Sequence, residues 1–251
     1  MRGAVDGVFP CVILVQFISI WVASHGYEWT VDVDSQNPAE VPHRIMGKHG
    51  AKMGVISQDC DDGQNHIDVD FGGSPEEYTC TMKDLLWYVT VGGWYRSLYK
   101  CHRVKKGYRP HHYCMNKRII YSDAIPTHEG HRPLWPVYGE YKYVPPQRWL
   151  HSIEHGAVVM LYHPCAPTWF VEKLRKLPLA LVAWGCKLQM SHVNMREVIK
   201  FIKEHALRGP EGRLSMEGQY SYMLLAKARP PGGSDMNDAN LCPALHENAL
   251  L

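Results

Sequence analysis

The sequence predicts an α+β fold: a single mixed domain of short strands with two to four helices, stabilised by disulfides and preceded by an irregular N-terminal portion. Short apolar runs alternate with two stretches of helical spacing, which favours strands and helices mixed along one chain. The 251 residues include eight cysteines and carry a formal net charge of only +2. This length is sufficient for a substantial hydrophobic core.

The N-terminus has the pattern of a secretory signal peptide. Arg2 precedes an apolar stretch from Val8 to Val22, and small residues offer a cleavage site after Ser24. The alternative is a retained signal anchor, but the stretch is shorter than the roughly twenty residues that a span requires. Removal of residues 1–24 would leave a secreted protein or one in the lumen of the secretory pathway.

Three segments are expected after the leader: an irregular polar segment over 25–75, the α+β domain over 76–228 and a disordered tail over 229–251. Acidic residues gather near Gly63 in the first of these. A calcium loop needs glycine at its sixth position and a closing glutamate. Gly63 is fifth from Asp59 and no glutamate follows at the closing position, so a solvated acidic loop is expected. The acidic residues are Asp59, Asp61, Asp62, Asp68 and Asp70.

The elements of the domain follow from local signals. Two prolines, Pro145 and Pro146, precede a short helical turn that Gly156 ends, and the apolar run from Ala157 to Tyr162 predicts a buried strand. The other expected strands cover residues 118–121, 138–144, 179–184 (with a bend at Gly185) and 220–226, and the other expected helices begin at Thr81, at Pro167 and at Ser191 as N-cap, the last one reaching His205.

The short helix carries the pattern His151-x-x-Glu154-His155. Residues four apart share one helix face, so both imidazoles can point at one ion with Glu154 beside them. In inverzincin metallopeptidases this pattern binds zinc through its histidines and activates water through its glutamate. A zinc-dependent hydrolase with Glu154 as general base is therefore one hypothesis. The helix has room for at most two turns, and no third ligand is evident.

A metal site without hydrolysis is a second hypothesis. His131 lies in the preceding loop and joins His151 and His155 as the candidate ligands, and imidazole suits zinc or copper. The competing interpretation is that Glu154 only orients a histidine by hydrogen bonding inside a folded corner. Other histidines that could converge there are His128 and His163; Cys165 as a nucleophile beside His163 is disfavoured, because a disulfide is expected there.

The cysteines agree with an oxidising compartment, in which most of them would pair. Cys242 lies in the polar tail and is the candidate for the odd thiol. Sequence alone leaves many connectivities open, and pairing of neighbours is the first one to test. The six candidates are Cys60 with Cys80, Cys101 with Cys114, and Cys165 with Cys186.

The charge pattern does not favour a nucleic-acid partner, which would require a concentrated basic face. The basic cluster from Arg103 to Arg109 is short and is expected to be a solvated loop. An unknown protein partner is left as the expectation.

Several landmarks occur together in order: Pro126-Thr-x-x-Gly-x-His131-Arg-Pro-Leu-Trp135, Tyr138-Gly-Glu-Tyr, Pro145-Pro-Gln-Arg-Trp-Leu-His151-x-x-Glu-His-Gly156, Leu161-Tyr-His-Pro-Cys165, Ala183-Trp-Gly185 and Gly209-Pro-Glu211. They resemble the domain of unknown function 3105, closest in form to its animal members of the p53-inducible protein 13 type. The resemblance covers about 120–212, and 78–101 more loosely. His131, His151, Glu154 and His155 match motif positions, but no catalytic residues are carried over.

This resemblance implies an extracytoplasmic domain without an assigned biochemical activity and, in animals, a role in restraining cell growth. Animal members are also expected to have a membrane-spanning segment after the domain, whereas this sequence continues as a polar tail; membrane association is left open. The leading hypothesis is a non-enzymatic regulator with a metal at His131, His151 and His155, and the alternative is the hydrolase.

Overall fold

The computed structural model describes residues 16–19, 46–47, 50–70, 79, 82, 96–162, 180–191, 194–211 and 217–228. Helices and strands are mixed along this part of the chain, and the predicted α+β class is confirmed. The elements are β1 (Gln16–Ser19), β2 (Met46–Gly47), β3 (Gly50–Ala51), the 3-10 helix η1 (Ile67–Val69), β4 (Leu98–Cys101), β5 (Gly139–Tyr141), α2 (Pro146–Glu154), β6 (Val159–Tyr162), β7 (Ala180–Ala183), β8 (Cys186–Gln189), α4 (Met195–His205) and β9 (Leu224–Lys227).

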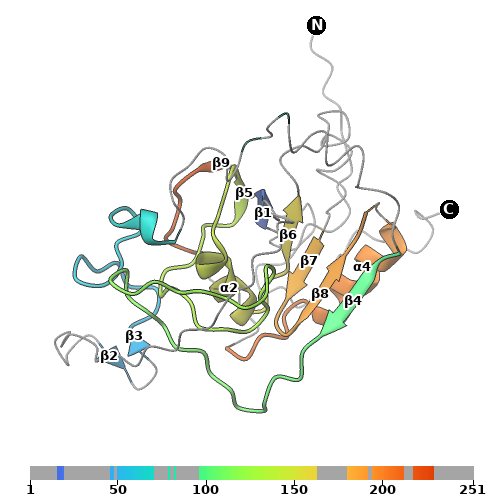
Figure 1. Cartoon of the computed structure of the whole chain (residues 1–251), viewed down its shortest axis with the longest axis horizontal. Coiled ribbons are helices and arrows are strands. Elements are labelled where there is room, and N and C mark those ends of the chain that lie inside the picture. Colours follow the sequence, from blue (N-terminus) through green and yellow to red (C-terminus); the bar gives the residue numbers. More distant parts are fainter. Residues whose placement is uncertain are drawn as a thin grey trace, which may run out of the picture.

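A seven-stranded sheet forms the centre of the fold, in the order β4-β8-β7-β6-β1-β5-β9. Strand β1 pairs in parallel with both β5 and β6, and the other neighbours in the sheet are antiparallel. The short strands β2 and β3 form a separate pair. In Figure 1 this pair lies away from the sheet, whose strands run across the picture from β4 to β9.

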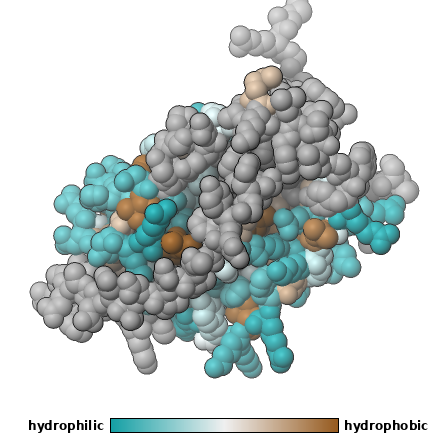
Figure 2. Space-filling model, viewed as in Figure 1, coloured by the Kyte–Doolittle hydropathy of each residue, from teal (hydrophilic) through white to brown (hydrophobic). Residues whose placement is uncertain are grey.

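The two faces of the sheet bury different helices, because successive strand residues point to opposite sides. Val158 and Met160 belong to one hydrophobic cluster together with Phe201 of α4. Val159 and Leu161 belong to a second cluster that includes residues of α2. The outer surface is mostly hydrophilic where Figure 2 describes it, with hydrophobic residues scattered singly.

Helix α2 is buried around its whole circumference, from Gln147 to Glu154. Its first residue is Pro146, and proline is tolerated there because an N–H at the first helical position has no acceptor within the helix. Gly156 follows the helix with a φ of +89°, which ends the helical conformation. Trp149, Leu150 and Ile153 pack into the hydrophobic cluster on one face of the sheet. The remaining residues carry polar side chains into the interior, where each needs a partner.

The N-terminal segment provides partners for Arg148 of α2 and for Arg132 in the loop beside it. The Arg148 guanidinium donates to both carboxylate oxygens of Asp61, at 2.5 and 2.9 Å, and Arg132 donates to Asp70 at 3.0 Å. At most 1% of each of the four side chains is exposed. The expectation of a solvated acidic loop is therefore wrong for Asp61 and Asp70, although Asp59 is exposed. The physical reason is that two interior guanidinium groups need buried anions.

The disulfides within the described residues are Cys60–Cys114 and Cys101–Cys186. The expected pairing of neighbours is wrong, since it assigned Cys60 to Cys80 and Cys101 to Cys114. Cys101 and Cys186 are opposite each other in the antiparallel register of β4 and β8, which brings them together across the sheet. Cys80, Cys165 and Cys242 lie outside the described residues.

Of the remaining expected strands and helices, some are confirmed, some are wrong and some fall outside the described residues. Strands expected over 138–144, 157–162, 179–184 and 220–226 are confirmed as β5, β6, β7 and β9. The strand expected over 118–121 is wrong, because this stretch is a loop whose Ile119 carbonyl accepts from the Gln147 side chain. Helix α4 is confirmed, but its N-cap is Asn194 instead of Ser191. The helices expected from Thr81 and Pro167 fall outside the described residues.

Strand β1 lies within residues 1–24, the expected leader, and its backbone is paired in this structure of the whole chain. The leader and the boundaries at 75 and 228 remain predictions. Among the described helices, none combines the length and the apolar character needed to cross a membrane.

The buried Asp61–Arg148 pair gives the first prediction. Asp61→Ala leaves the Arg148 charge buried without its main partner and should lower the free energy of unfolding by about 3–5 kcal/mol. Asp59→Ala is the matched control, because Asp59 is exposed two residues away and its loss should cost about 0.5 kcal/mol or less. Urea unfolding measures both variants, and equal effects would contradict the role given to Asp61.

Candidate metal centre

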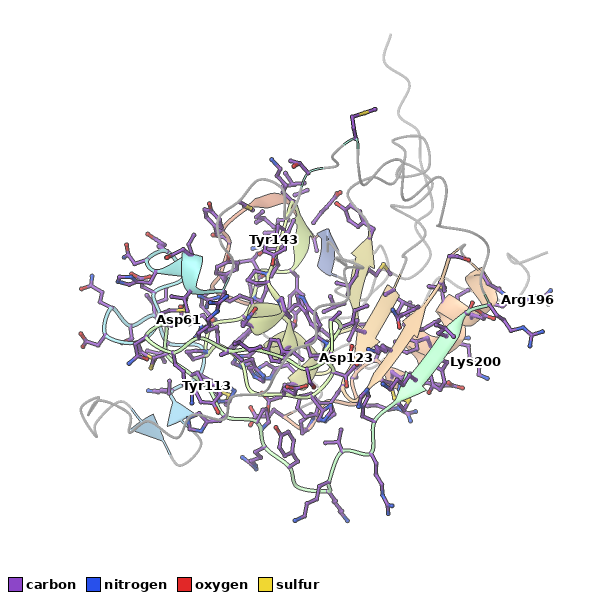
Figure 3. All side chains as sticks on the ribbon, in the orientation of Figure 1. Asp61, Tyr113, Asp123, Tyr143, Arg196 and Lys200 are labelled. Atoms are coloured by element: carbon purple, nitrogen blue, oxygen red, sulfur yellow. A yellow bond between two sulfur atoms is a disulfide. The ribbon has the colours of Figure 1, made fainter. Side chains whose placement is uncertain are left out.

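Two loop segments pair with each other and bring His112 and His131 together. The His131 N–H donates to the His111 carbonyl at 3.0 Å, and the Tyr113 N–H donates to the His131 carbonyl at 2.9 Å. This is an isolated parallel bridge between residues 112 and 131. Tyr113, labelled in Figure 3, marks this segment next to α2. The two imidazoles therefore lie side by side, with ring centroids 4.8 Å apart.

Helix α2 adds the third histidine. The Arg132 N–H donates to the Gln147 carbonyl at 2.8 Å, which ties the loop to the first turn of the helix. One turn later, His151 Nδ1 donates to the Arg132 carbonyl at 2.6 Å. The His151 ring centroid consequently lies 4.8 Å from each of the other two.

Glu154 completes the group, which we call the three-histidine centre: His112, His131, His151 and Glu154. One ligand atom from each residue lies within 4.8 Å of the other three, and all four residues are buried. Glu154 Oε2 is 2.9 Å from Nε2 of His131 and 3.3 Å from Nε2 of His112. Ligands of one tetrahedral zinc ion, each about 2.0–2.1 Å from it, are about 3.3 Å apart. These two distances suit a single ion, while the ligand atoms of the whole group lie up to 4.8 Å apart.

The hydrogen bonds of His131 leave too few protons at this centre. His131 Nδ1 donates to the Glu129 carbonyl at 2.8 Å, so the Nε2 of a neutral ring has only a lone pair. That lone pair faces a carboxylate oxygen at 2.9 Å. Either a second proton on His131 or a metal ion would remove the repulsion. His151 repeats the pattern, since its Nδ1 is engaged and its buried Nε2 has no hydrogen-bond partner among the described residues.

In this cluster the ionised form of Glu154 is stabilised by the neighbouring histidines, while burial disfavours the protonated form of those histidines. Burial alone would raise the pKa of Glu154, but hydrogen bonds and charge from His112 and His131 outweigh it and lower that pKa to about 2. Burial lowers the pKa of His131, and it lowers the pKa of His151 well below the ordinary 6.5. The low pKa of Glu154 depends on a proton on His112 or His131, whereas burial favours neutral rings at His131 and His151. Metal ions bind ionised carboxylates and neutral imidazoles, so a bound ion would take the place of that proton.

The group in the structure differs from the ligand set expected from the sequence: His155 is absent from it, and His112 and Glu154 are added. His131 and His151 lie in the three-histidine centre, as does Glu154, whereas His155 lies beside it as the residue that follows α2. The His155 ring stacks on that of His151, with centroids 5.0 Å apart and an interplanar angle of 18°. Trp135 packs against both rings at 4.6 and 4.7 Å.

Sequence reasoning missed His112. Its only local signal is the His111-His112 pair, and its place in the site depends on pairing with a segment nineteen positions later. His128 lies elsewhere: its Nδ1 is 3.0 Å from the Thr127 hydroxyl, and its ring lies 5.3 Å from that of His102. His163 and Cys165 fall outside the described residues.

A second group of metal-binding residue types, Cys101, Cys186 and His205, lies at the edge of the sheet. Its two sulfur atoms are joined in a disulfide. They are therefore not thiolates, the form in which cysteine binds metals.

The loop after α4 holds the end of α2 in place. The Leu207 N–H donates to the Gly156 carbonyl at 2.7 Å, and the Glu211 N–H donates to the Glu154 carbonyl at 3.3 Å. A Cβ atom at Gly209 would lie only 2.0 Å from that same Glu154 carbonyl oxygen. Glycine is therefore required at position 209. The two hydrogen bonds and this close approach together hold the backbone that carries Glu154 in place.

The lowered His151 pKa gives a prediction for the metal-free protein. The folded state holds this imidazole neutral, so the unfolded state binds its proton at a higher pH. The neutral His151 should therefore make its full contribution to the free energy of unfolding above pH 6.5. This contribution should decrease as the pH drops below that value. Urea unfolding of chelator-treated protein on either side of this pH should show a smaller loss for His151→Gln than for the wild type. An equal loss would contradict the assignment.

Part of the chain is similar to a family of known sequences. Residues 112–178 match the sequence model described as Protein of unknown function (DUF3105). This is about a quarter of the chain, and it begins at His112 and includes the whole three-histidine centre. No curated protein and no solved structure matches the chain. The part of the chain that carries the centre is thus similar to a family whose description assigns no function.

Proposed function

We propose that this protein is a secreted or lumenal, non-enzymatic domain that binds one divalent transition-metal ion at the three-histidine centre. The observation that carries the proposal is the 2.9 Å approach of His131 Nε2 to Glu154 Oε2. Because His131 Nδ1 already donates to a carbonyl, a neutral ring has no proton to place between these two atoms. A cation bound between the two atoms would replace the repulsion of their lone pairs with two coordination bonds.

The donor set favours zinc or copper. Three imidazole nitrogens and one carboxylate oxygen provide no soft sulfur ligand, and imidazole suits both metals. Zinc sites with four protein ligands are structural, whereas catalytic zinc sites keep one position open for water. The four residues here are at most 3% exposed. A closed site of this kind supports a structural role for the ion.

The second hypothesis, a zinc-dependent hydrolase with Glu154 as general base, has less support. A general base must stand beside the metal-bound water and accept its proton. Glu154 Oε2 instead lies at ligand spacing from two imidazoles. In addition, α2 has only nine residues, whereas the related peptidases carry the motif within a long helix.

A regulatory role rests on the resemblance. The animal members of the p53-inducible protein 13 type imply restraint of cell growth, and similarity to their wider family covers residues 112–178. The disulfides support an extracytoplasmic location, because such bonds persist in oxidising compartments. In this proposal the ion stabilises the domain, and the domain acts through an unidentified protein partner.

Elemental analysis of the purified, tag-free protein tests the proposal. We expect about one equivalent of zinc or copper per chain. His112→Gln should lose most of it, because it removes a ligand without changing the size of the side chain greatly. His111→Gln is the matched control, since His111 is the exposed neighbour on the same segment. A wild-type protein without stoichiometric metal after expression with both metals supplied would rule the proposal out.

Glu154→Gln separates the two hypotheses. If Glu154 is a ligand, this variant should bind the ion at least about 10–100-fold more weakly, because a neutral amide replaces an anionic donor. If Glu154 is a general base, the variant should keep the ion and lose turnover only. Competition with a chromogenic chelator measures the affinity, and an unchanged dissociation constant would contradict the ligand role.

A further inference from the structure

A pocket lies at the outer edge of the sheet, lined by residues of the first strand in the sheet order, β4, of its neighbour β8 and of helix α4. Its volume is about 230 Å³. Sites for small molecules typically have roughly 300–1,000 Å³, so this pocket is better suited to a single long side chain. In Figure 3 the labelled Lys200 of α4 lies beside β4 at this end of the sheet.

Aromatic rings form the floor of the pocket. Tyr99 of β4 is 54% exposed and lies opposite Leu188 of β8 in the register of the sheet. Its ring meets that of Phe201 edge to face, with centroids 6.2 Å apart. The Tyr99 hydroxyl is hydrogen-bonded to Nε2 of His205 at 2.8 Å, which holds the ring in place. A cation placed over such an exposed ring is attracted to its π-electrons.

The wall formed by α4 carries more negative than positive charge. Glu197, Lys200 and Glu204 all line the pocket, because residues three and four apart share one side of a helix. Lys200 is the one cation among the lining residues, and its Nζ is 3.9 Å from Oε1 of Glu204. Both of these side chains are largely exposed, so this ion pair is weak. Glu197 has a buried Oε2 without a hydrogen-bond partner among the described residues. One carboxylate charge of the pocket is therefore not compensated.

The backbone of β4 offers hydrogen-bonding groups next to this pocket. All four residues of the strand are exposed. The His102 N–H donates to the Gly185 carbonyl at 2.7 Å, one position beyond the register pair of Cys101 and Cys186. In an antiparallel ladder this makes the pairs formed by Cys101 and Tyr99 the non-hydrogen-bonded ones, so the N–H and C=O groups of both residues point away from β8. An open edge of this kind is a template for a further strand.

We propose that β4 and this pocket bind an extended segment of a partner protein that carries an arginine or a lysine. The segment adds as a strand beside β4, and its cationic side chain enters the pocket. Hydrogen bonds to the backbone of Tyr99 and Cys101 provide affinity, and the pocket selects the side chain. A residue placed opposite Tyr99 points its side chain to the same face of the sheet, where the ring and the carboxylates of Glu197 and Glu204 lie. This inference goes beyond the proposed metal site and does not depend on it.

The test uses the full chain and a short, fluorescently labelled peptide of alternating threonine and valine with one arginine at its centre. Matched peptides carry lysine, glutamine or glutamate at the central position. Fluorescence anisotropy gives each dissociation constant. We expect the arginine or the lysine peptide to bind at least about tenfold more tightly than the glutamine peptide, and the glutamate peptide to bind most weakly.

Variants of α4 should change this preference in opposite directions. Glu197→Gln and Glu204→Gln should each weaken binding of the cationic peptide by about tenfold and that of the glutamine peptide by less than about twofold. Lys200→Gln should instead strengthen binding of the cationic peptide, because it removes the competing ammonium group. Asp59→Asn is the matched control, since it removes one negative charge from an exposed side chain that does not line the pocket.

Alternate N-methylation of the peptide tests the addition of a strand. Successive N–H groups of a strand point to opposite edges, so methyl groups on one alternating set block the edge that faces β4, whereas methyl groups on the other set face solvent. One of the two methylated peptides should lose binding and the other should keep it.

Several results would overturn the inference. They are equal affinities of the cationic and glutamine peptides, an unchanged Kd in folded Glu197→Gln and Glu204→Gln variants, and an equal loss of binding for the two methylated peptides. A dimer of the wild-type chain that Glu197→Gln dissociates, in the absence of peptide binding, would assign β4 to a second copy of the chain and would also overturn it. A chain that binds the cationic peptide but no metal would overturn only the proposed function.

Discussion

The complete burial of α2 is the constraint from which the rest of the structure follows. A nine-residue helix with no solvent-facing side cannot leave its polar side chains unpaired without a large desolvation cost. Arg148 is paired by Asp61, and the Arg132 carbonyl accepts from His151. The N-terminal segment and the loops around residues 112 and 131 pack where they do because they provide these partners. His151 and Glu154 contribute to the three-histidine centre, and Ser152 Oγ is buried without a partner among the described residues.

The sequence could predict the parts of the fold that depend on neighbours in the chain. Prolines at 145 and 146 and glycine at 156 delimit α2, and the apolar run after it is β6, because these signals act locally. Strand β4 gave no such signal, since all four of its residues are exposed and its position depends on pairing with β8. His131, His151 and Glu154 were found through a helical spacing and a motif. His112 and the buried state of Asp61 were missed, because both depend on contacts between distant segments.

A cluster held by hydrogen bonds alone and a metal site differ in how many of their ring nitrogens carry protons. Glu154 can orient His112, whose Nε2 lies 3.3 Å from Oε2, as the competing interpretation held. His131 and His151 instead direct their Nδ1 donors to backbone carbonyls, which leaves lone pairs facing inward. Such outer hydrogen bonds are typical of histidines that bind metals, because they fix the tautomer and the ring orientation. The backbone around the centre thus determines its chemistry as much as the side chains do.

The absence of a side chain at Gly209 has a consequence for the contact between the turn after α4 and the end of α2. It allows the turn that follows α4 to lie directly on the carbonyl of Glu154. Helix α4, in turn, covers the opposite face of the sheet through Phe201 and Ile202. The turn after α4 and the end of α2 are therefore in direct contact, although the two helices cover opposite faces of the sheet. A side chain added at position 209 would thus disturb elements on both faces of the sheet at once.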